Sequence, residues 1–461
     1  MCLHMPKVHI CGIGGEGWSW IAKVLIEKGW QVSGCDINKN VRVGELKKIG
    51  LKDFKLGHSP AHINRNLDYF LYTSAILNYK KPLEELSKAS KLGINSFDRN
   101  AFFKVFLNKY NVIAISGTHG KTSTSSITAF LLDSLGDKCG FGIGGIPKNF
   151  SINGRVGDSK NFVVEADEFG NAFHGLTPSV GVITSLEHDH PDFFPRFNDY
   201  LNSFKKFSKK VKNNGVLIGF GDNFNIKNLL KNSKLKTISY GFNKDNDYVV
   251  SHPQLLGLTT SFWVTPKGFP RSRSGIKIKI PFPGFQYALN STASLLVCVF
   301  LGYSLKKASL KLLNYQGVKR RFEYQIINGI TLVDDYAHHP TELKITLDQA
   351  KLTGKRVIVV YEPHQYNRCF AFKEQFKGVF KKADIFIQTS IYASRESPPF
   401  PISNEEFYKI CAKGVKRSFY VNTWEKSPKL VKKLVKKGDL ILVMGVGNGS
   451  NIVSKLSEIF V

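Results

Sequence analysis

The sequence predicts an α/β protein of three domains in which the sheets are mostly parallel. Apolar, strand-like segments recur along the whole 461-residue chain and alternate with helix-like stretches. Several of these segments run straight into glycine-rich turns or end in acids and histidines, and ligands of open parallel sheets gather at such strand ends. The length fits about three domains at roughly 150 residues each.

We expect domain boundaries near residues 108 and 315, where one series of strands and helices gives way to the next. The predicted domains are therefore residues 1–108, 109–315 and 316–461. The sequence shows no internal repeat, low-complexity tract or long linker between them.

A glycine-rich turn follows the first expected strand. The strand covers residues 7–11, and the turn reads GIGGEG at residues 12–17. A second strand ends at Asp36, about 20 residues further on, which completes the pattern of a Rossmann unit. The pattern predicts that a phosphate group approaches the N-terminus of the following helix, and it leaves open whose phosphate that is.

The second domain opens with an apolar strand that runs into GTHGKTS at residues 117–123. Glycines in such a turn let backbone N–H groups close on phosphate oxygens, Lys121 adds a positive charge, and the Thr122 hydroxyl can bind magnesium. A standard Walker loop has a further glycine five residues before Gly120, where this chain has Ile115, so the loop is a shortened form. We therefore predict a site for a nucleoside triphosphate with Mg²⁺.

Acids and histidines follow two later strands of the same domain. Glu165 ends the segment NFVVE, and His190 ends EHDH after the apolar segment at 180–184. Because ligands collect at the carboxyl ends of parallel strands, we expect Glu165 and His190 to reach a Mg²⁺ ion held near Thr122. Taken alone, either cluster is explained more simply by helix caps and exposed loop charges.

The order of all these motifs resembles that of the Mur ligase family over essentially the full chain. The matching segments are GIGGEG, GTHGKT, EADE, EHDH, the PG…N of PGFQYALN, KRRFE, DDYAHHPTE and PHQYNR. The resemblance implies a Rossmann-like UDP-sugar-binding domain, a central P-loop ATPase domain and a C-terminal Rossmann-like domain that binds an amino acid. It also implies an ATP-dependent ligase of peptidoglycan precursor synthesis, which forms an acyl phosphate before the amide bond.

The resemblance assigns roles to individual residues. The implied catalytic residues are Lys121, His190, Arg321 and Asp335. ATP is expected on Gly117, Thr118, His119, Gly120, Lys121, Thr122, Ser123, Asn290 and Arg321, and Mg²⁺ on Thr122, Glu165 and His190. The UDP-sugar is expected on Gly12, Gly14, Gly15, Gly17 and Ser74, and the amino acid on Tyr336, His338, His364 and Arg368. For the histidines, a structural capping role remains the alternative.

Within the family, the motifs imply UDP-N-acetylmuramate and L-alanine as the substrates. Two departures leave the acceptor open. Gln365 stands where arginine is usual, and the segment GGIPKNF at 144–150 is more similar to ligases that attach a recycled tripeptide to the same UDP-sugar. A third departure, Gln286-Tyr287 after the PG turn, means that only Asn290 of the usual adenine contacts carries over.

The net charge of +29 allows a different class of function, a nucleic-acid-stimulated ATPase without ligase activity. Against it, the lysines spread along the whole chain, and no arginine-rich arm, zinc finger or aromatic-basic segment appears. We expect a solvated basic surface that attracts nucleotides, and no nucleic-acid partner.

Seven cysteines are scattered without CxxC pairs or metal-like spacing. Cys11, Cys35 and Cys298 lie in apolar segments and are expected to act as small hydrophobes. The longest apolar stretch, residues 295–301, is far shorter than the roughly 20 residues that cross a bilayer. We therefore expect a cytoplasmic protein without membrane insertion, as a monomer or homodimer.

Overall fold

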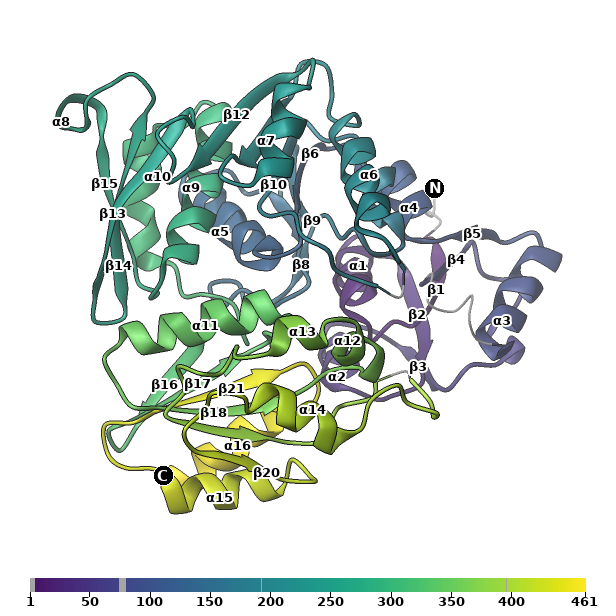
Figure 1. Cartoon of the computed structure of the whole chain (residues 1–461). Helices are drawn as coiled ribbons and strands as arrows, with labels where there is room; N and C mark the ends of the chain where they lie inside the picture. Colours follow the sequence, from purple (N-terminus) through teal and green to yellow (C-terminus); the bar gives the residue numbers. More distant parts are fainter. Residues whose placement is uncertain (1–4, 74–79, 192, 395) are drawn as a thin grey trace. The chain divides into compact units, whose positions relative to one another are not determined.

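The computed structural model of the chain describes residues 5–73, 80–191, 193–394 and 396–461. The chain forms two compact units. The first consists of Met1–Glu187, Phe197–Val249 and Thr292–Lys311, and the second of His188–Arg196, Val250–Ser291 and Leu312–Val461. Mostly parallel sheets alternate with helices in both (Figure 1), so the predicted α/β class is confirmed.

The first sheet of the first unit is entirely parallel, in the order β3-β2-β1-β4-β5. Its strands are β1 (Lys7–Cys11), β2 (Gln31–Asp36), β3 (Asp53–Leu56), β4 (Tyr69–Tyr72) and β5 (Asn95–Phe97), and its main helices are α1 (Glu16–Glu27), α2 (Val41–Lys48) and α3 (Lys80–Lys91). The strand order reverses beside β1, where Val8 and Ile10 are fully buried. Ligands of doubly wound sheets bind at such a point, next to the turn after β1.

The second sheet of this unit runs β12-β11-β10-β6-β9-β7-β8, and only β7 and β8 pair antiparallel. Its strands are β6 (Asn111–Ser116), β7 (Gly140–Gly142), β8 (Gly154–Arg155), β9 (Asn161–Glu165), β10 (Val180–Ile183), β11 (Val216–Phe220) and β12 (Lys236–Gly241). The flanking helices include α5 (Lys121–Ser134), α6 (Phe197–Ser208) and α7 (Phe224–Lys231). The buried strand β6 lies between β9 and β10, so the turn after β6 is flanked by the carboxyl ends of both neighbours.

Helix α1 of the first sheet packs against the second sheet through Trp20, which is 3% exposed. Its indole stacks on Phe103 and lies beside Phe162. Gly142 and Gly154 make room for it, because a Cβ atom at either position would lie 2.2 Å from the ring or 2.6 Å from the Trp20 carbonyl oxygen. This contact between α1 and the second sheet therefore needs both glycines.

The main sheet of the second unit runs β16-β17-β21-β18-β19-β20 and is parallel except for β16. Its strands are β16 (Glu323–Ile327), β17 (Ile330–Asp335), β18 (Val357–Glu362), β19 (Ile385–Gln388), β20 (Ser418–Tyr420) and β21 (Leu440–Gly445). The helices include α11 (Pro340–Leu352), α12 (Tyr366–Ala371), α14 (Asn404–Cys411), α15 (Lys426–Leu434) and α16 (Gly449–Phe460). Branched aliphatic side chains such as Ile358, Val360 and Ile441 fill the core beneath α15 and α16, as buried parallel strands require.

The second unit also contains the antiparallel hairpin of β14 (Thr259–Pro266) and β15 (Ile276–Ile280). Strand β13 (Tyr248–Leu256) and helix α9 (Phe285–Phe300) run from one unit into the other. Over the ranges that the structure describes, no helix has both the length and the apolar character needed to cross a bilayer. The domain boundaries near residues 108 and 315 stay a prediction.

Candidate active site

The turn between β6 and α5 has the backbone of an anion-binding loop. Gly117 and Gly120 adopt φ angles of +134° and +82°, which side chains other than glycine rarely adopt. Gly120 is the N-cap of α5. Because glycine has no side chain, the cap residue offers no side-chain acceptor to the N–H groups of the first helical turn. Such a helix start favours negative charge. The geometry fits phosphate oxygens here, as the sequence predicted.

Lys121 folds back over this loop. Its Nζ donates to the carbonyl oxygens of Gly117 at 2.6 Å and Thr118 at 3.2 Å, and to the carboxylate of Glu168 at 2.9 Å. Burial alone would lower the pKa of Lys121, but the charge of Glu168 raises it above its usual value. The lysine is therefore held as a cation beside the loop.

Glu168 was missed among the predicted site residues. Its side chain is fully buried, and it accepts hydrogen bonds from Lys121 and from the Tyr200 hydroxyl at 3.0 Å. The signal available in the sequence was the last acid of EADE, three residues beyond the end of β9. Glu168 positions Lys121, which the motif analysis had identified without this partner.

Two of the three predicted magnesium ligands lie together in the first unit. The Thr122 hydroxyl donates to Glu165 Oε1 at 2.7 Å, and the Gly144 N–H donates to Oε2 at 2.7 Å. A hydroxyl and a carboxylate are the oxygen ligands that Mg²⁺ prefers, so this pair fits the ion. His190, the third predicted ligand, belongs to the second unit, where it adopts a φ of +54°.

The loop after β10 holds the phosphate loop in place. The His119 N–H donates to Ser185 Oγ at 2.7 Å, and Thr184 Oγ1 donates to the His119 carbonyl at 2.5 Å. The imidazole Nε2 of His119 pairs with Glu187. His119 is thus fixed by the neighbouring strand end, and its side chain is engaged with an acid within the same unit.

Replacing Gly117 with alanine should destabilise the protein more than replacing Gly136. Both glycines have positive φ, so both variants carry similar backbone strain. A Cβ at Gly117 would lie 2.3 Å from Thr184 Oγ1 and 2.9 Å from two backbone nitrogens, whereas nothing lies within 4 Å of one at Gly136. We expect an extra loss of about 1–3 kcal/mol for Gly117→Ala from this overpacking, measured by chemical denaturation. Equal losses in the two variants would contradict the steric argument.

The turn after β1 is held by hydrogen bonds to residues at and just after the end of β2. The Gly14 N–H donates to Asp36 Oδ2 at 3.0 Å, and the Asn40 amide donates to the Gly14 carbonyl at 3.1 Å. A Cβ at Gly17 would lie 2.4 Å from the Arg99 guanidinium, so this glycine leaves room for that side chain. The structure places Gly12, Gly14 and Gly15 in this turn and Gly17 in the first turn of α1, whereas Ser74 lies outside the described residues.

Arg321 and Asp335 lie close together in the second unit. Asp335 ends β17 and accepts the backbone N–H groups of Phe322 at 2.7 Å and Ala337 at 2.8 Å. Burial raises the pKa of Asp335 to about 6, although Arg321 opposes the rise. The Arg321 guanidinium lies 5.0 Å from the centre of the Tyr336 ring. Within the same unit, the Asn290 side-chain oxygen accepts a hydrogen bond from Gln286 at 3.0 Å.

Three residues that the sequence predicted to bind the amino-acid substrate have neighbouring rings in the second unit. The imidazole of His338 lies 5.7 Å from the ring of Tyr336 and 5.7 Å from that of His364, both edge to face. Burial lowers the pKa of His338 to about 4, and the charge of Arg368 adds to this effect. His338 is therefore neutral at physiological pH.

Arg368 is buried and pairs with Asp189 through Nη1. Burial alone would raise the pKa of Asp189, but the positive charge of Arg368 holds it well below its usual range. Asp189 was not among the predicted site residues, although it stands beside His190 in EHDH. An incoming carboxylate that binds Arg368 would share the guanidinium with this acid.

The neutral state of His338 predicts a pH dependence of stability. Its pKa is about 4 in the folded protein and about 6.5 when unfolded. Between these values the unfolded chain binds more protons, so the stability contributed by the neutral imidazole is present above pH 6.5 and is lost as the pH falls towards 4. We expect a loss of about 3 kcal/mol over this window. Denaturation at several pH values should show a shallower dependence in His338→Gln, and identical slopes would contradict the assignment.

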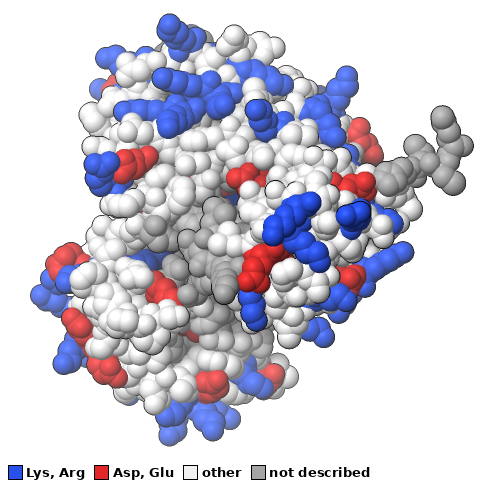
Figure 2. Space-filling model, turned by 90° about the vertical axis from the view of Figure 1, so that its right-hand side faces the viewer, with Lys and Arg blue, Asp and Glu red and all other residues white. Residues whose placement is uncertain are grey.

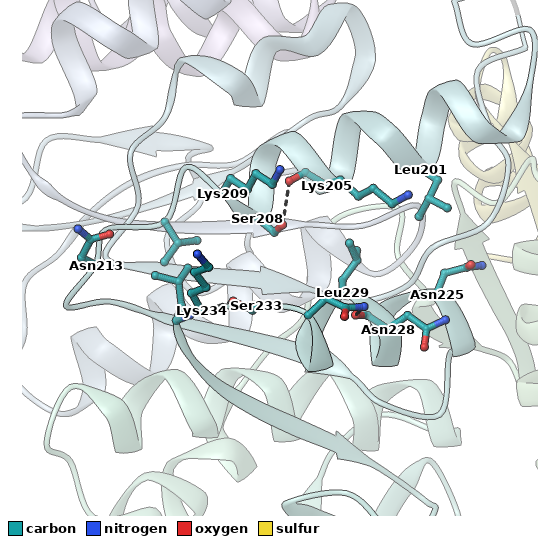
Figure 3. A pocket seen from close by; sticks show the side chains of 13 residues that line it. Leu201, Lys205, Ser208, Lys209, Asn213, Asn225, Asn228, Leu229, Ser233 and Lys234 are labelled. Carbon is teal, nitrogen blue, oxygen red and sulfur yellow. Dashed lines mark hydrogen bonds between the residues drawn. The ribbon is translucent and has the colours of Figure 1, made fainter.

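A groove of about 1000 Å³ lies between α6 and α7 of the first unit. Lys205 and Lys209 line one side of it, and Asn225 and Asn228 the other (Figure 3). None of its lining residues belongs to the phosphate loop or to the strand ends around it. This groove is therefore separate from the candidate active site.

Basic side chains are widespread on the surface. Figure 2 shows lysines and arginines on many parts of one face, with fewer acids among them. This agrees with the net charge of +29. A positive field of this kind raises the rate at which polyanions such as nucleotides reach the protein.

Comparison with known proteins identifies the class to which this fold and phosphate loop belong. Residues 7–111 match the Mur ligase family catalytic domain, residues 115–298 the Mur ligase middle domain, and residues 320–447 the Mur ligase glutamate ligase domain. The chain belongs to the Mur ligase family, and it is an ATP-dependent ligase. The family predicted from the motifs is confirmed.

Individual relatives cover nearly the whole chain. The chain is 32% identical over 454 residues to a UDP-N-acetylmuramate–L-alanine ligase of a Sulfurihydrogenibium species, covering 98% of this chain and 97% of the relative. It is 34% identical over 457 residues to the enzyme of that name from Acetivibrio thermocellus, with coverage of 98% and 95%. The crystal structure of the UDP-N-acetylmuramate-alanine ligase MurC of Thermotoga maritima matches the fold with a TM-score of 0.81, at 23% identity and with coverage of 98% and 99%.

Proposed function

We propose that this protein joins L-alanine to the lactyl carboxylate of UDP-N-acetylmuramate, with cleavage of ATP to ADP and phosphate. The observation that carries this proposal is the phosphate loop between β6 and α5. Lys121, the N-terminus of α5 and the Thr122–Glu165 pair all lie at this loop. The full-length similarity to enzymes of this name supports the choice of substrates.

The proposed reaction begins with the binding of ATP on residues 117–123. Backbone N–H groups of the turn and the ammonium group of Lys121 neutralise charge on the transferring phosphoryl group, and this is the main requirement of phosphoryl transfer. A Mg²⁺ ion bound by Thr122 and Glu165, with His190 as a third ligand, would add charge neutralisation there. The lactyl carboxylate becomes an acyl phosphate, which is a better electrophile than the carboxylate.

The amino group of the acceptor then attacks the acyl carbon, and phosphate leaves. In our proposal Arg368 binds the carboxylate of the incoming amino acid through its planar guanidinium, with Tyr336, His338 and His364 around it. The neutral His338, whose pKa burial holds at about 4, would accept a hydrogen bond from the amino group of the incoming amino acid. Arg321, Asp335 and Asn290 are assigned to the nucleotide.

The turn at residues 12–17 is proposed to bind the diphosphate of the UDP-sugar. Its supporting features are the position beside the strand-order reversal and the helix start at α1. Ser74 is assigned to the same substrate. We further propose that the enzyme acts in the cytoplasm, as a monomer or homodimer without a nucleic-acid partner.

A phosphate-release assay tests the proposed reaction. We expect release from ATP only when UDP-N-acetylmuramate and L-alanine are both present, with much slower release on L-serine or glycine. Greater activity with the recycled tripeptide would favour the alternative acceptor that Gln365 leaves open. Release stimulated by DNA or RNA and independent of the UDP-sugar would replace the ligase with a nucleic-acid-dependent ATPase.

A further inference from the structure

A cluster of buried metal-binding side chains lies in the first unit, outside the residues assigned to any substrate. Cys11 and Cys35 are paired in register on the neighbouring parallel strands β1 and β2, so their side chains leave the same face of the sheet. His58 follows β3, and Glu85 lies on α3. Cys11, Cys35 and Glu85 are fully buried, and the His58 side chain is 11% exposed.

One ligand atom from each of the four residues lies within 4.8 Å of the other three. The Sγ atoms of Cys11 and Cys35 lie 3.4 Å and 3.2 Å from His58 Nδ1. Glu85 Oε1 lies 3.4 Å from the Cys35 Sγ, and Glu85 Oε2 lies 3.4 Å from the His58 nitrogen. A tetrahedral zinc ion with S, N and O ligands has edges of roughly 3.3–3.8 Å between its ligand atoms. The cluster already has nearly these dimensions.

The charge of Glu85 also points to a cation. Its described hydrogen-bond and ion-pair partners are the Ser59 N–H, the Cys35 thiol, His58 and His62, and none of these is a lysine or arginine. A buried carboxylate needs an opposite charge. Glu168, the other fully buried glutamate discussed above, has this in Lys121. At Glu85 the opposite charge would come from protonated imidazoles of His58 and His62 or from a bound divalent cation.

A second layer of side chains surrounds the four ligands. His62 Nδ1 lies 2.9 Å from Glu85 Oε1 and would orient that carboxylate, as outer hydrogen bonds do around metal ligands. His9 bonds Ser33 Oγ at 2.9 Å through Nδ1, while its buried Nε2 has no hydrogen-bond partner among the described residues. His9 and His62 complete a second overlapping ligand set with Cys35 and Glu85.

We propose that Cys11, Cys35, His58 and Glu85 bind one zinc ion in a structural role. Four protein ligands close the coordination sphere and leave no position for a substrate, which is typical of structural zinc. The ion would tie the ends of β1 and β2 to α3 and to the loop after β3. Asp36, next to Cys35, accepts the Gly14 N–H, so the ion would also fix the glycine turn that follows β1.

The test begins with the metal content of the full chain, purified under reducing conditions without chelator or metal-affinity tag. We expect about one zinc per chain by mass spectrometry of the elements. After zinc removal, Co²⁺ should bind in its place and give a thiolate-to-cobalt charge-transfer band with the visible absorption of tetrahedral cobalt. Absence of both zinc and the thiolate–cobalt band would overturn the proposal.

Variants make the test specific. Cys35→Ala should lose the zinc, whereas Cys298→Ala, at an equally buried cysteine on α9, should retain it. Retention of the same zinc by Cys35→Ala would show adventitious binding and overturn the site. If Cys35→Ala fails to fold, the cobalt spectrum of the unaltered protein decides. A disulfide between Cys11 and Cys35 is the alternative to metal binding by these two residues. The intact mass of protein that is purified without reductant and then denatured would reveal this disulfide, and its presence would also overturn the proposal.

Discussion

Lys121→Ala is expected to abolish ATP-dependent ligation while leaving the chain folded. Lys121 lies at the phosphate loop, where it bonds two loop carbonyls and Glu168. Removal of a charged group that stabilises a transferring phosphoryl group reduces turnover by about 10³-fold or more. Initial rates of phosphate release, with circular dichroism to verify folding, would measure this loss.

Lys138→Ala is the matched control, because Lys138 follows the same helix and its side chain is 56% exposed. Its turnover should equal that of the unaltered protein. Calorimetric titration with Mg-ATP separates binding from chemistry, and Lys121→Ala should weaken both. Substantial turnover in the folded Lys121→Ala variant would overturn the assignment of the loop.

Arg368→Ala is expected to have the largest effect on stability. The variant leaves the carboxylate of Asp189 buried without its partner, since the two side chains are only 5% and 7% exposed. Breaking a buried ion pair from one side costs about 3–5 kcal/mol. Lys382→Ala, which removes an exposed partner of Asp348, should cost less than about 1 kcal/mol. Urea denaturation of both variants at neutral pH would give the comparison.

The dependence on pH identifies the cause of this loss. Because the folded pKa of Asp189 lies well below 3.8, the stability it contributes is present above that value and is lost as the pH falls further. In Arg368→Ala the acid should protonate at higher pH, so the deficit of the variant should shrink in acid. A deficit that is constant from neutral to acid pH would indicate lost packing instead of an unpaired charge.

Local features of the fold were predictable from the sequence because each depends on neighbouring residues. The buried strand before Gly117 and the glycines of positive φ in its turn are encoded within about ten residues. Glu165 could be placed near Thr122 because both follow strands of one parallel sheet, and the observed 2.7 Å contact agrees.

Pairings between distant segments could not be predicted in this way. Asp189 and Arg368 are 179 residues apart, and nothing in either motif specifies the other. The cluster of Cys11, Cys35 and His58 has no motif spacing, because its members come from separate strands and loops that only the parallel pairing brings together. For this reason the sequence led us to expect that Cys11 and Cys35 act only as small hydrophobic side chains.

Trp20 limits how this chain can be divided into fragments. A fragment that ends at the proposed boundary near residue 108 would keep the indole and lose Gly142 and Gly154, which receive it. The truncated piece would present a large aromatic surface to water and would tend to self-associate. Ligand-binding studies of the glycine turn after β1 are therefore better carried out on a piece that retains the second sheet.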